Sequence, residues 1–136
     1  MKILLLGSGA REHALARALA RDPQTSELIV APGNPGTSAI ATNLNIDPSV
    51  PEEVVALATQ MKADLVVVGP EAPLVAGVAD AVRDAGIPCF GPEAKAAIIE
   101  GSKVFSKDLM KKYGIPTAEY QVFTDAAAAM DYVKSC

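Results

Sequence analysis

The residues best suited to chemistry lie near the N-terminus, in the run GSGAREHA at positions 7–14. Gly7 and Gly9 permit a tight turn and a close approach of the backbone to a ligand. The amphipathic segment that follows, 11–21, indicates a helix. The free amide groups and the positive dipole end of a helix N-terminus attract anions. The spacing therefore predicts a phosphate-binding turn, in which Arg11 either pairs with the phosphate or stays a solvated surface residue.

This turn departs at two points from the G-x-G-x-x-G fingerprint of dinucleotide-binding proteins. Glu12 stands in place of the third glycine, and no carboxylate follows the second apolar segment, where a ribose-binding acid would lie. Both differences disfavour a nicotinamide or flavin dinucleotide and favour a smaller ligand that carries a phosphate. Glu12 either faces hydroxyl or amine groups of that ligand or only complements the helix dipole. A nicotinamide-dependent oxidoreductase with a variant turn remains the alternative enzyme class.

Two further loops supply candidate ligand-binding residues. Asn34, Pro35 and Gly36 follow the second apolar segment, and the amide of Asn34 can both donate and accept hydrogen bonds. The same three residue types also suit a plain turn. Glu71 follows a glycine and a proline at the end of another apolar run, which places a carboxylate at the same edge of a sheet. His13, the only histidine, belongs to no His–carboxylate–nucleophile set, so we expect it to be structural.

Strand-like and helix-like segments alternate along residues 1–92, which predicts an α/β fold with a doubly wound parallel sheet. Such folds bind ligands beyond the carboxyl ends of their strands, so the three candidate loops should meet at one crevice. The expected strands cover 2–6, 27–31, 43–46, 64–68 and 87–90, and the expected helices cover 11–21, 51–62 and 74–85.

The pattern changes after Pro92. Helices are expected over 93–100 and 102–113, a strand over 118–123, and a last helix from 125 that has no stop signal before the end of the chain. We therefore expect three parts: a ligand-binding domain over 1–92, a helical linker over 93–104, and the incomplete start of a second domain over 105–136.

The composition excludes several classes of function. Half of the 136 residues are apolar and 21% are charged, as in an ordinary globular domain. A formal charge of −4, with only three tyrosines and three phenylalanines, argues against nucleic-acid binding. No apolar run is long enough to cross a membrane, and no targeting segment is evident. Cys89 and Cys136 form neither a disulfide framework nor a metal motif, which favours a reduced, cytoplasmic protein.

Taken together, these motifs resemble the N-terminal part of the glycinamide ribonucleotide synthetases, also called phosphoribosylamine–glycine ligases. The resemblance is carried by GSGAREHA at 7–14, PGNPG at 32–36, VGPEAPL at 68–74 and GSK at 101–103. Members of this family are ATP-grasp ligases of purine biosynthesis, which join glycine to 5-phosphoribosylamine with ATP and Mg²⁺ or Mn²⁺.

The resemblance implies a Rossmann-like domain that binds and orients phosphoribosylamine, followed by the start of an ATP-grasp domain. Lys103 would contact a nucleotide phosphate in that second domain. The implied substrate-binding residues are Gly7, Gly9, Arg11, Glu12, Asn34, Pro35, Gly36 and Glu71.

Complete members of the family are much longer than this chain. The groups that bind the metal, glycine and most of the ATP would therefore lie outside it, and we expect the chain alone to hold no cofactor and to be inactive. Its expected partners are small molecules (5-phosphoribosylamine, glycine and ATP) and the remainder of a ligase chain. A stand-alone phosphoribosyl-binding module is the non-enzymatic alternative.

Overall fold

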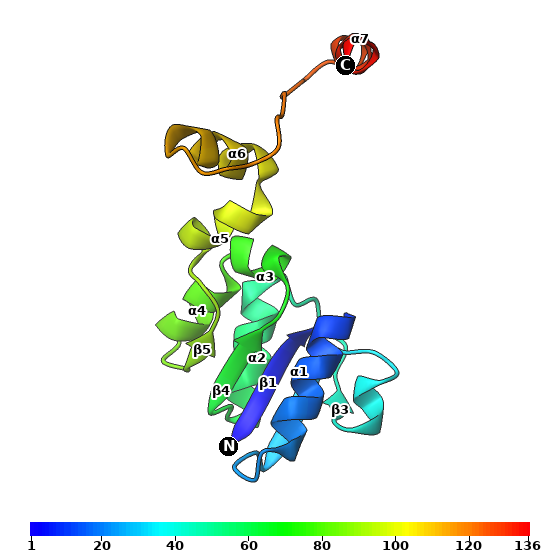
Figure 1. Cartoon of the computed structure of the whole chain (residues 1–136). Helices are drawn as coiled ribbons and strands as arrows, with labels where there is room; N and C mark the ends of the chain where they lie inside the picture. The colour runs from blue at the N-terminus through cyan, green and yellow to red at the C-terminus, as the bar shows by residue number, and fades with distance from the viewer. The chain divides into compact units, whose positions relative to one another are not determined.

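The computed structural model describes residues 1–136 and contains a five-stranded parallel sheet (Figure 1). The strand order is β3-β2-β1-β4-β5, so the chain moves outward from β1 in one direction and then returns to continue in the other. This order confirms the doubly wound α/β fold. The strands are β1 (Lys2–Gly7), β2 (Glu27–Pro32), β3 (Thr42–Asn43), β4 (Leu65–Val68) and β5 (Cys89–Phe90).

The chain forms two compact units, residues 1–101 and residues 102–136. None of its helices is both long and apolar enough to span a membrane. The helices are α1 (Ala10–Arg21), the 3₁₀ helix η1 (Thr37–Ala39), α2 (Pro51–Met61), α3 (Glu71–Val75), α4 (Val78–Asp84), α5 (Ala94–Gly101), α6 (Lys103–Lys112) and α7 (Ala126–Ser135).

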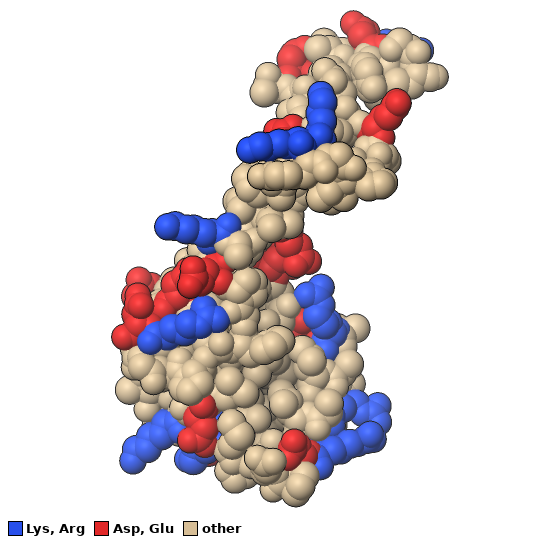
Figure 2. Space-filling model, turned by 60° about the vertical axis from the view of Figure 1, so that its left-hand side comes forward, with Lys and Arg blue, Asp and Glu red and all other residues tan.

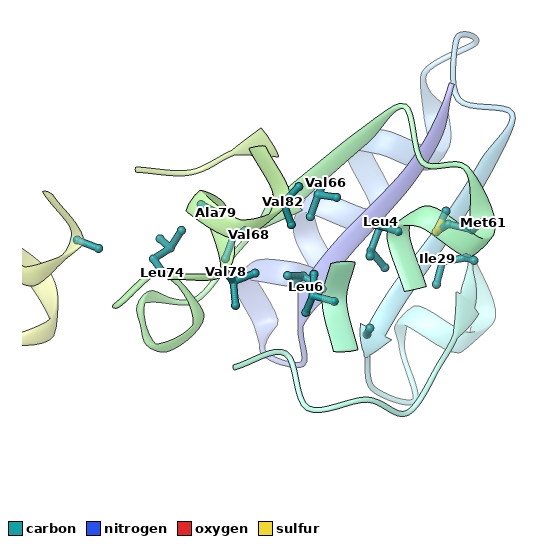
Figure 3. Close-up of a cluster of buried hydrophobic side chains, with 14 residues drawn as sticks. Leu4, Leu6, Ile29, Met61, Val66, Val68, Leu74, Val78, Ala79 and Val82 are labelled. Carbon is teal, nitrogen blue, oxygen red and sulfur yellow. The ribbon is translucent and has the colours of Figure 1, made fainter. Parts of the chain in front are cut away.

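The first unit has an apolar layer on each face of its sheet. Alternate residues of a strand point to opposite faces, so an entirely apolar strand such as β1 is covered on both sides. Leu4 and Leu6 face α2 and α4, in the cluster drawn in Figure 3. Ile3 and Leu5 face the opposite way and pack near Ala16 of α1. Burial on both faces fixes the register of β1 and so the position of the turn that follows it.

Four elements differ from the sequence-based expectation, and one of them, β5, is only shortened, to Cys89–Phe90 instead of 87–90. The third strand covers only Thr42–Asn43 instead of 43–46, because β2 is its single partner and the pairing ends there. The helix expected over 74–85 is two helices, α3 and α4, separated by Gly77 in the left-handed region at φ 87°. Residues 118–123 form no strand, because no neighbouring strand lies beside them to accept their hydrogen bonds.

The division between the compact units also differs from the expected linker over 93–104. Helix α5 packs against α3, and Ala97 in its centre is buried, so residues 93–101 belong to the first unit. The second unit begins at Ser102, whose hydroxyl oxygen caps α6 by accepting a hydrogen bond from the amide of Phe105. The domain boundaries of a complete protein stay a prediction.

Candidate functional site

The turn between β1 and α1 is built on Gly7 and Gly9. Gly7 adopts φ 126°, a conformation that residues with a Cβ rarely reach, and its carbonyl oxygen accepts a hydrogen bond from the amide of Gly33 at 3.1 Å. Gly9 is the N-cap of α1, and its carbonyl oxygen accepts the first hydrogen bond of the helix, from His13. The turn therefore brings the N-terminus of α1 to the carboxyl edge of the sheet.

Glu12 fills the space beneath this turn. Its side chain is only 4% exposed, and one carboxylate oxygen accepts a hydrogen bond from the amide of Gly9 at 2.8 Å. A Cβ added to Gly7, Gly9 or Gly69 would lie 2.4, 2.9 and 2.4 Å, respectively, from the nearest atom of Glu12. The glycines thus make room for a buried carboxylate, a reason that the sequence did not reveal, in addition to the expected approach of a ligand.

Arg11 connects this turn to the loop after β4. Its guanidinium donates a hydrogen bond from Nη1 to the carbonyl oxygen of Gly69 at 2.8 Å, while the side chain remains exposed. A guanidinium has five N–H donors, so others remain for a ligand. Arg11 therefore bridges two loops and keeps an exposed charged group at their edge, and its pairing with a phosphate stays a prediction.

Asn34 connects the same turn to the loop after β2. Its Nδ2 donates to the carbonyl oxygens of Ser8 at 2.9 Å and Gly9 at 3.4 Å. Its Oδ1 accepts from the amides of Gly36 at 2.8 Å and Thr37 at 3.0 Å. The amide of Asn34 does donate and accept, as its chemistry predicts, but the partners are backbone groups of its own chain.

The three loops surround a hollow of about 450 Å³ at the carboxyl ends of β1 and β4. Strand order reverses between these two strands, and that reversal is where α/β sheets bind ligands. Most of the wall, including Pro48 and Ser49, could not be predicted from the sequence, because no local signal marks the loop after β3 as part of this site. The lining residues are Gly7, Ser8, Gly9, Glu12, Pro32, Pro48, Ser49, Pro70, Ala72 and Pro73.

Five of the predicted substrate-binding residues do not line this hollow, namely Arg11 and Asn34, described above, and Pro35, Gly36 and Glu71. Glu71 is the first residue of α3 and lines a separate hollow of about 400 Å³ together with Glu100. Gly36 packs against the imidazole of His13, where an added Cβ would lie 2.3 Å from Cε1. Pro35 is exposed on the loop next to it. A substrate contact by Glu71, Pro35 or Gly36 stays a prediction.

Lys103 lies in the second unit, at the first position of α6. It borders a hollow of about 360 Å³ whose wall includes Lys107 and Tyr120. The ammonium group of Lys107 donates to Thr117 Oγ1 at 2.7 Å and to the carbonyl oxygen of Ala118 at 3.0 Å. Lys103, which is exposed, is thus the freer of the two cations for a phosphate.

The electrostatics of the surface are mixed. Figure 2 shows acidic and basic side chains interspersed on the face drawn, without a continuous basic patch. No three His, Cys, Asp or Glu side chains gather where they could hold a metal ion. Burial raises the pKa of the Cys89 thiol above its ordinary value, an effect that Arg83 opposes and Asp80 reinforces. No Lys or Arg lines the hollow at the carboxyl ends of β1 and β4.

Family models match the whole chain. Residues 1–100 match the N domain of phosphoribosylglycinamide synthetase, and residues 101–136 match the ATP-grasp (A) domain of the same enzyme. The chain belongs to the phosphoribosylglycinamide synthetase family. This result confirms the resemblance seen in the sequence, and the change from one family model to the next lies one residue from the boundary between the compact units.

Curated relatives of the phosphoribosylglycinamide synthetase family share about half of the sequence. The phosphoribosylamine–glycine ligase of Mycobacterium tuberculosis is 58% identical over 131 residues, which is 96% of this chain and 31% of the relative. The enzyme of Rhizobium meliloti is 52% identical over 134 residues, which is 98% of this chain and 32% of the relative. The chain thus spans about a third of the length of these family members.

Solved structures agree with the family and extend the fold to other enzymes. The phosphoribosylamine–glycine ligase of Thermotoga maritima is 30% identical with a TM-score of 0.65, over 99% of this chain and 30% of that protein. The biotin carboxylase domain of the Hydrogenobacter thermophilus 2-oxoglutarate carboxylase has a TM-score of 0.67 at 20% identity, over 98% of this chain and 32% of that protein. This second likeness shows a shared fold alone.

Proposed function

We propose that this chain supplies the phosphoribosylamine-binding part of an ATP-dependent ligase that joins glycine to 5-phosphoribosylamine. Phosphoribosylamine would lie in the hollow at the carboxyl ends of β1 and β4, with its phosphate near the N-terminus of α1. The remainder of a longer ligase chain would supply glycine binding, and the complete enzyme would use ATP with Mg²⁺ or Mn²⁺ in the cytoplasm.

The single observation that carries this proposal is the hollow itself, at the strand reversal, in a chain whose first 100 residues match the N domain of this family. A phosphate at this place would meet the amide groups of Ala10 and Arg11, which donate to no acceptor within the chain. The guanidinium of Arg11 can add a charge-assisted hydrogen bond. Ribose hydroxyls would then face Ser49 and the proline-rich walls.

The contribution of these residues to the reaction is orientation. Holding an amine in line with an activated carboxyl group removes part of the entropic barrier of a bimolecular step. The ATP would supply the free energy for activating the carboxyl group of glycine. Lys103 supports a nucleotide phosphate site in the second unit, because it is an exposed cation on the rim of a hollow.

The geometry weighs against the rival oxidoreductase. In a dinucleotide-binding turn, the position of Glu12 would be a glycine that lets the helix pack closely on the strand. Here a buried carboxylate occupies that space and uses the amide of Gly9, which would otherwise be free to bind a pyrophosphate. We therefore expect no measurable affinity for NAD.

Calorimetric titration of the whole chain tests the proposal. Ribose 5-phosphate, which carries the phosphate and the ribose of the substrate, should bind with one site per chain, and NAD should not bind. Arg11→Ala should weaken ribose 5-phosphate binding about tenfold through loss of a charged hydrogen bond, whereas Arg17→Ala, on an exposed position of the same helix, should not. Binding of NAD in preference to ribose 5-phosphate would overturn the proposal.

A second measurement separates a ligase part from a stand-alone binding module. The chain should give no turnover of ATP with glycine and phosphoribosylamine by itself. Turnover should appear when a polypeptide covering the remaining length of a related ligase is added. Ribose 5-phosphate binding without any such complementation would favour the binding module.

A further inference from the structure

We propose that Glu12 and Asn34 act together as positioning residues that fix the peptide group between Ser8 and Gly9. The inference rests on the proposed function, because this peptide precedes the amides that would bind the substrate phosphate. Neither residue would then be a direct ligand, although both stand among the residues that the family resemblance implies for the substrate site.

The two side chains hold opposite ends of one peptide. In a trans peptide the carbonyl group of Ser8 and the amide N–H of Gly9 point in opposite directions. Asn34 Nδ2 donates to that carbonyl oxygen at 2.9 Å, and the Glu12 carboxylate accepts from that N–H at 2.8 Å. Rotation of the peptide would break both hydrogen bonds at once, so its orientation is fixed from two sides.

Each of the two side chains is itself held in place. Asn34 accepts backbone hydrogen bonds at Oδ1, and its own carbonyl oxygen accepts a hydrogen bond from Asn43 Nδ2 at 2.9 Å. Glu12 is enclosed by Gly7 and Gly69, neither of which could carry a Cβ without a clash. The peptide is therefore bound to the loop after β2 through Asn34 and to the first turn of α1 through Glu12.

This arrangement decides which amides remain for a phosphate. The N–H of Gly9 is used by Glu12, so the available donors are the next two, on Ala10 and Arg11. Their directions follow from the fixed peptide before them, because each backbone step has only two soft dihedral angles. Glu12 is buried, and one of its carboxylate oxygens already accepts the hydrogen bond from the amide of Gly9.

The first test removes the hydrogen bond from Asn34 to Ser8 by a substitution that keeps the size of the side chain. Asn34→Asp keeps an acceptor for the amides of Gly36 and Thr37 but loses the donor to Ser8. Binding of ribose 5-phosphate should weaken about tenfold, with the thermal midpoint of unfolding changed little. Asn45→Asp is the matched control, since Asn45 is exposed, and its affinity should equal that of the unmodified chain. Unchanged affinity in Asn34→Asp would overturn the inference.

The second test separates the acceptor of Glu12 from its bulk. Glu12→Gln keeps an acceptor for Gly9 and should retain affinity within about threefold, whereas Glu12→Met fills the same space without an acceptor and should lose about tenfold. Both residues act on one peptide, so their effects should not add. The double variant of Asn34→Asp with Glu12→Met should bind ribose 5-phosphate no more weakly than whichever single variant has the lower affinity. Fully additive losses would contradict a shared target.

The ¹H–¹⁵N resonance of Gly9 reports on the peptide independently of any ligand. A hydrogen bond to a carboxylate shifts an amide proton downfield, so Glu12→Met should move the Gly9 resonance upfield, and Asn34→Asp should move it as well. If the unmodified chain fails to bind ribose 5-phosphate, the proposed function fails, and a Gly9 resonance that still responds to both substitutions supports the fixed peptide by itself. A resonance that ignores either substitution overturns it.

Discussion

Residues 1–101 and residues 102–136 have similar apolar content in their helices but differ completely in burial. The first unit buries two apolar layers on the faces of its sheet. In the second unit no residue is buried, and apolar side chains such as Val133, 69% exposed, face solvent. The difference follows from the presence of a sheet in one unit and its absence from the other.

In the second unit, local capping groups define where α6 and α7 begin, although the unit has no buried residue. Asp125 caps α7 by accepting a hydrogen bond from the amide of Ala128 at 2.8 Å, and Ser102 does the same for α6 at 3.2 Å. Caps and periodicity define where these helices begin. Most helical stability in proteins, however, comes from burying an apolar face, and neither of these helices has a buried residue.

Hydrogen exchange should show the largest contrast between the units. Amides of Leu4, Leu5 and Leu6 in β1 should exchange only on global unfolding, whereas amides of 118–136 should exchange through local opening. Protection factors should differ by a factor on the order of a thousand or more. Equal protection in the two regions, measured by NMR, would refute the contrast.

A matched pair of substitutions measures the same contrast as stability. Val54 of α2 is fully buried, and Val133 of α7 is exposed. Val54→Ala should lower the free energy of unfolding by about 2 kcal/mol, through lost burial and a residual cavity. Val133→Ala should change it by less than about 0.5 kcal/mol. Urea denaturation followed by circular dichroism gives both values, and a large loss in Val133→Ala would reveal packing on α7.

The reaction rates of the two cysteines, Cys89 in the first unit and Cys136 in the second, report on how far each unit shields its thiol. Burial raises the pKa of the Cys89 thiol, so less thiolate forms at pH 8, whereas Cys136 is exposed. A thiol reagent should react with Cys136 about tenfold faster than with Cys89, and Cys136→Ser should remove the fast phase. Raising the pH through the raised pKa should accelerate the Cys89 phase. A single phase for both thiols would show that Cys89 is not protected by burial in solution.

The smallest expected effect concerns local order within the second unit. The hydrogen bond from the Tyr120 hydroxyl to Asp108 raises the pKa of that phenol above its ordinary value of 10.0. Asp108→Asn should move the pKa of Tyr120 back toward 10.0, and Asp131→Asn, on α7, should not. Absorbance titration of the tyrosines measures the shift. The absence of any shift would show that this contact is not populated in solution.

Part of the fold and of the candidate site could be predicted from the sequence. The apolar run before Gly7, the glycine spacing and the alternation of segments predicted the sheet class and the turn at its carboxyl edge. The absence of a third glycine at Glu12 correctly weighed against a dinucleotide-binding family. These features are local, so a window of a few residues contains the information.

The partners of the polar side chains could not be predicted in this way. Asn34 lies 26 positions from Ser8, the residue whose carbonyl oxygen it binds, and Arg11 lies 58 positions from Gly69. The split of one expected helix into α3 and α4, and the inclusion of α5 in the first unit, likewise depend on packing between distant segments. Helix propensity determines neither the split nor the packing of α5, because tertiary contacts override it.

The sequence by itself determined that a glycine turn follows a doubly buried strand, and that the chain resembles the phosphoribosylglycinamide synthetases. Periodicity and glycine spacing suffice for the strand and the turn, since they act over a few residues, and the resemblance to the family is carried by the motifs at 7–14, 32–36, 68–74 and 101–103. Only the tertiary structure decided that Glu12 and Asn34 form hydrogen bonds with opposite ends of the Ser8–Gly9 peptide, and that Pro48 and Ser49 line the hollow. Those relations arise when parallel strands bring distant loops to one edge, where their backbone groups must find hydrogen-bond partners.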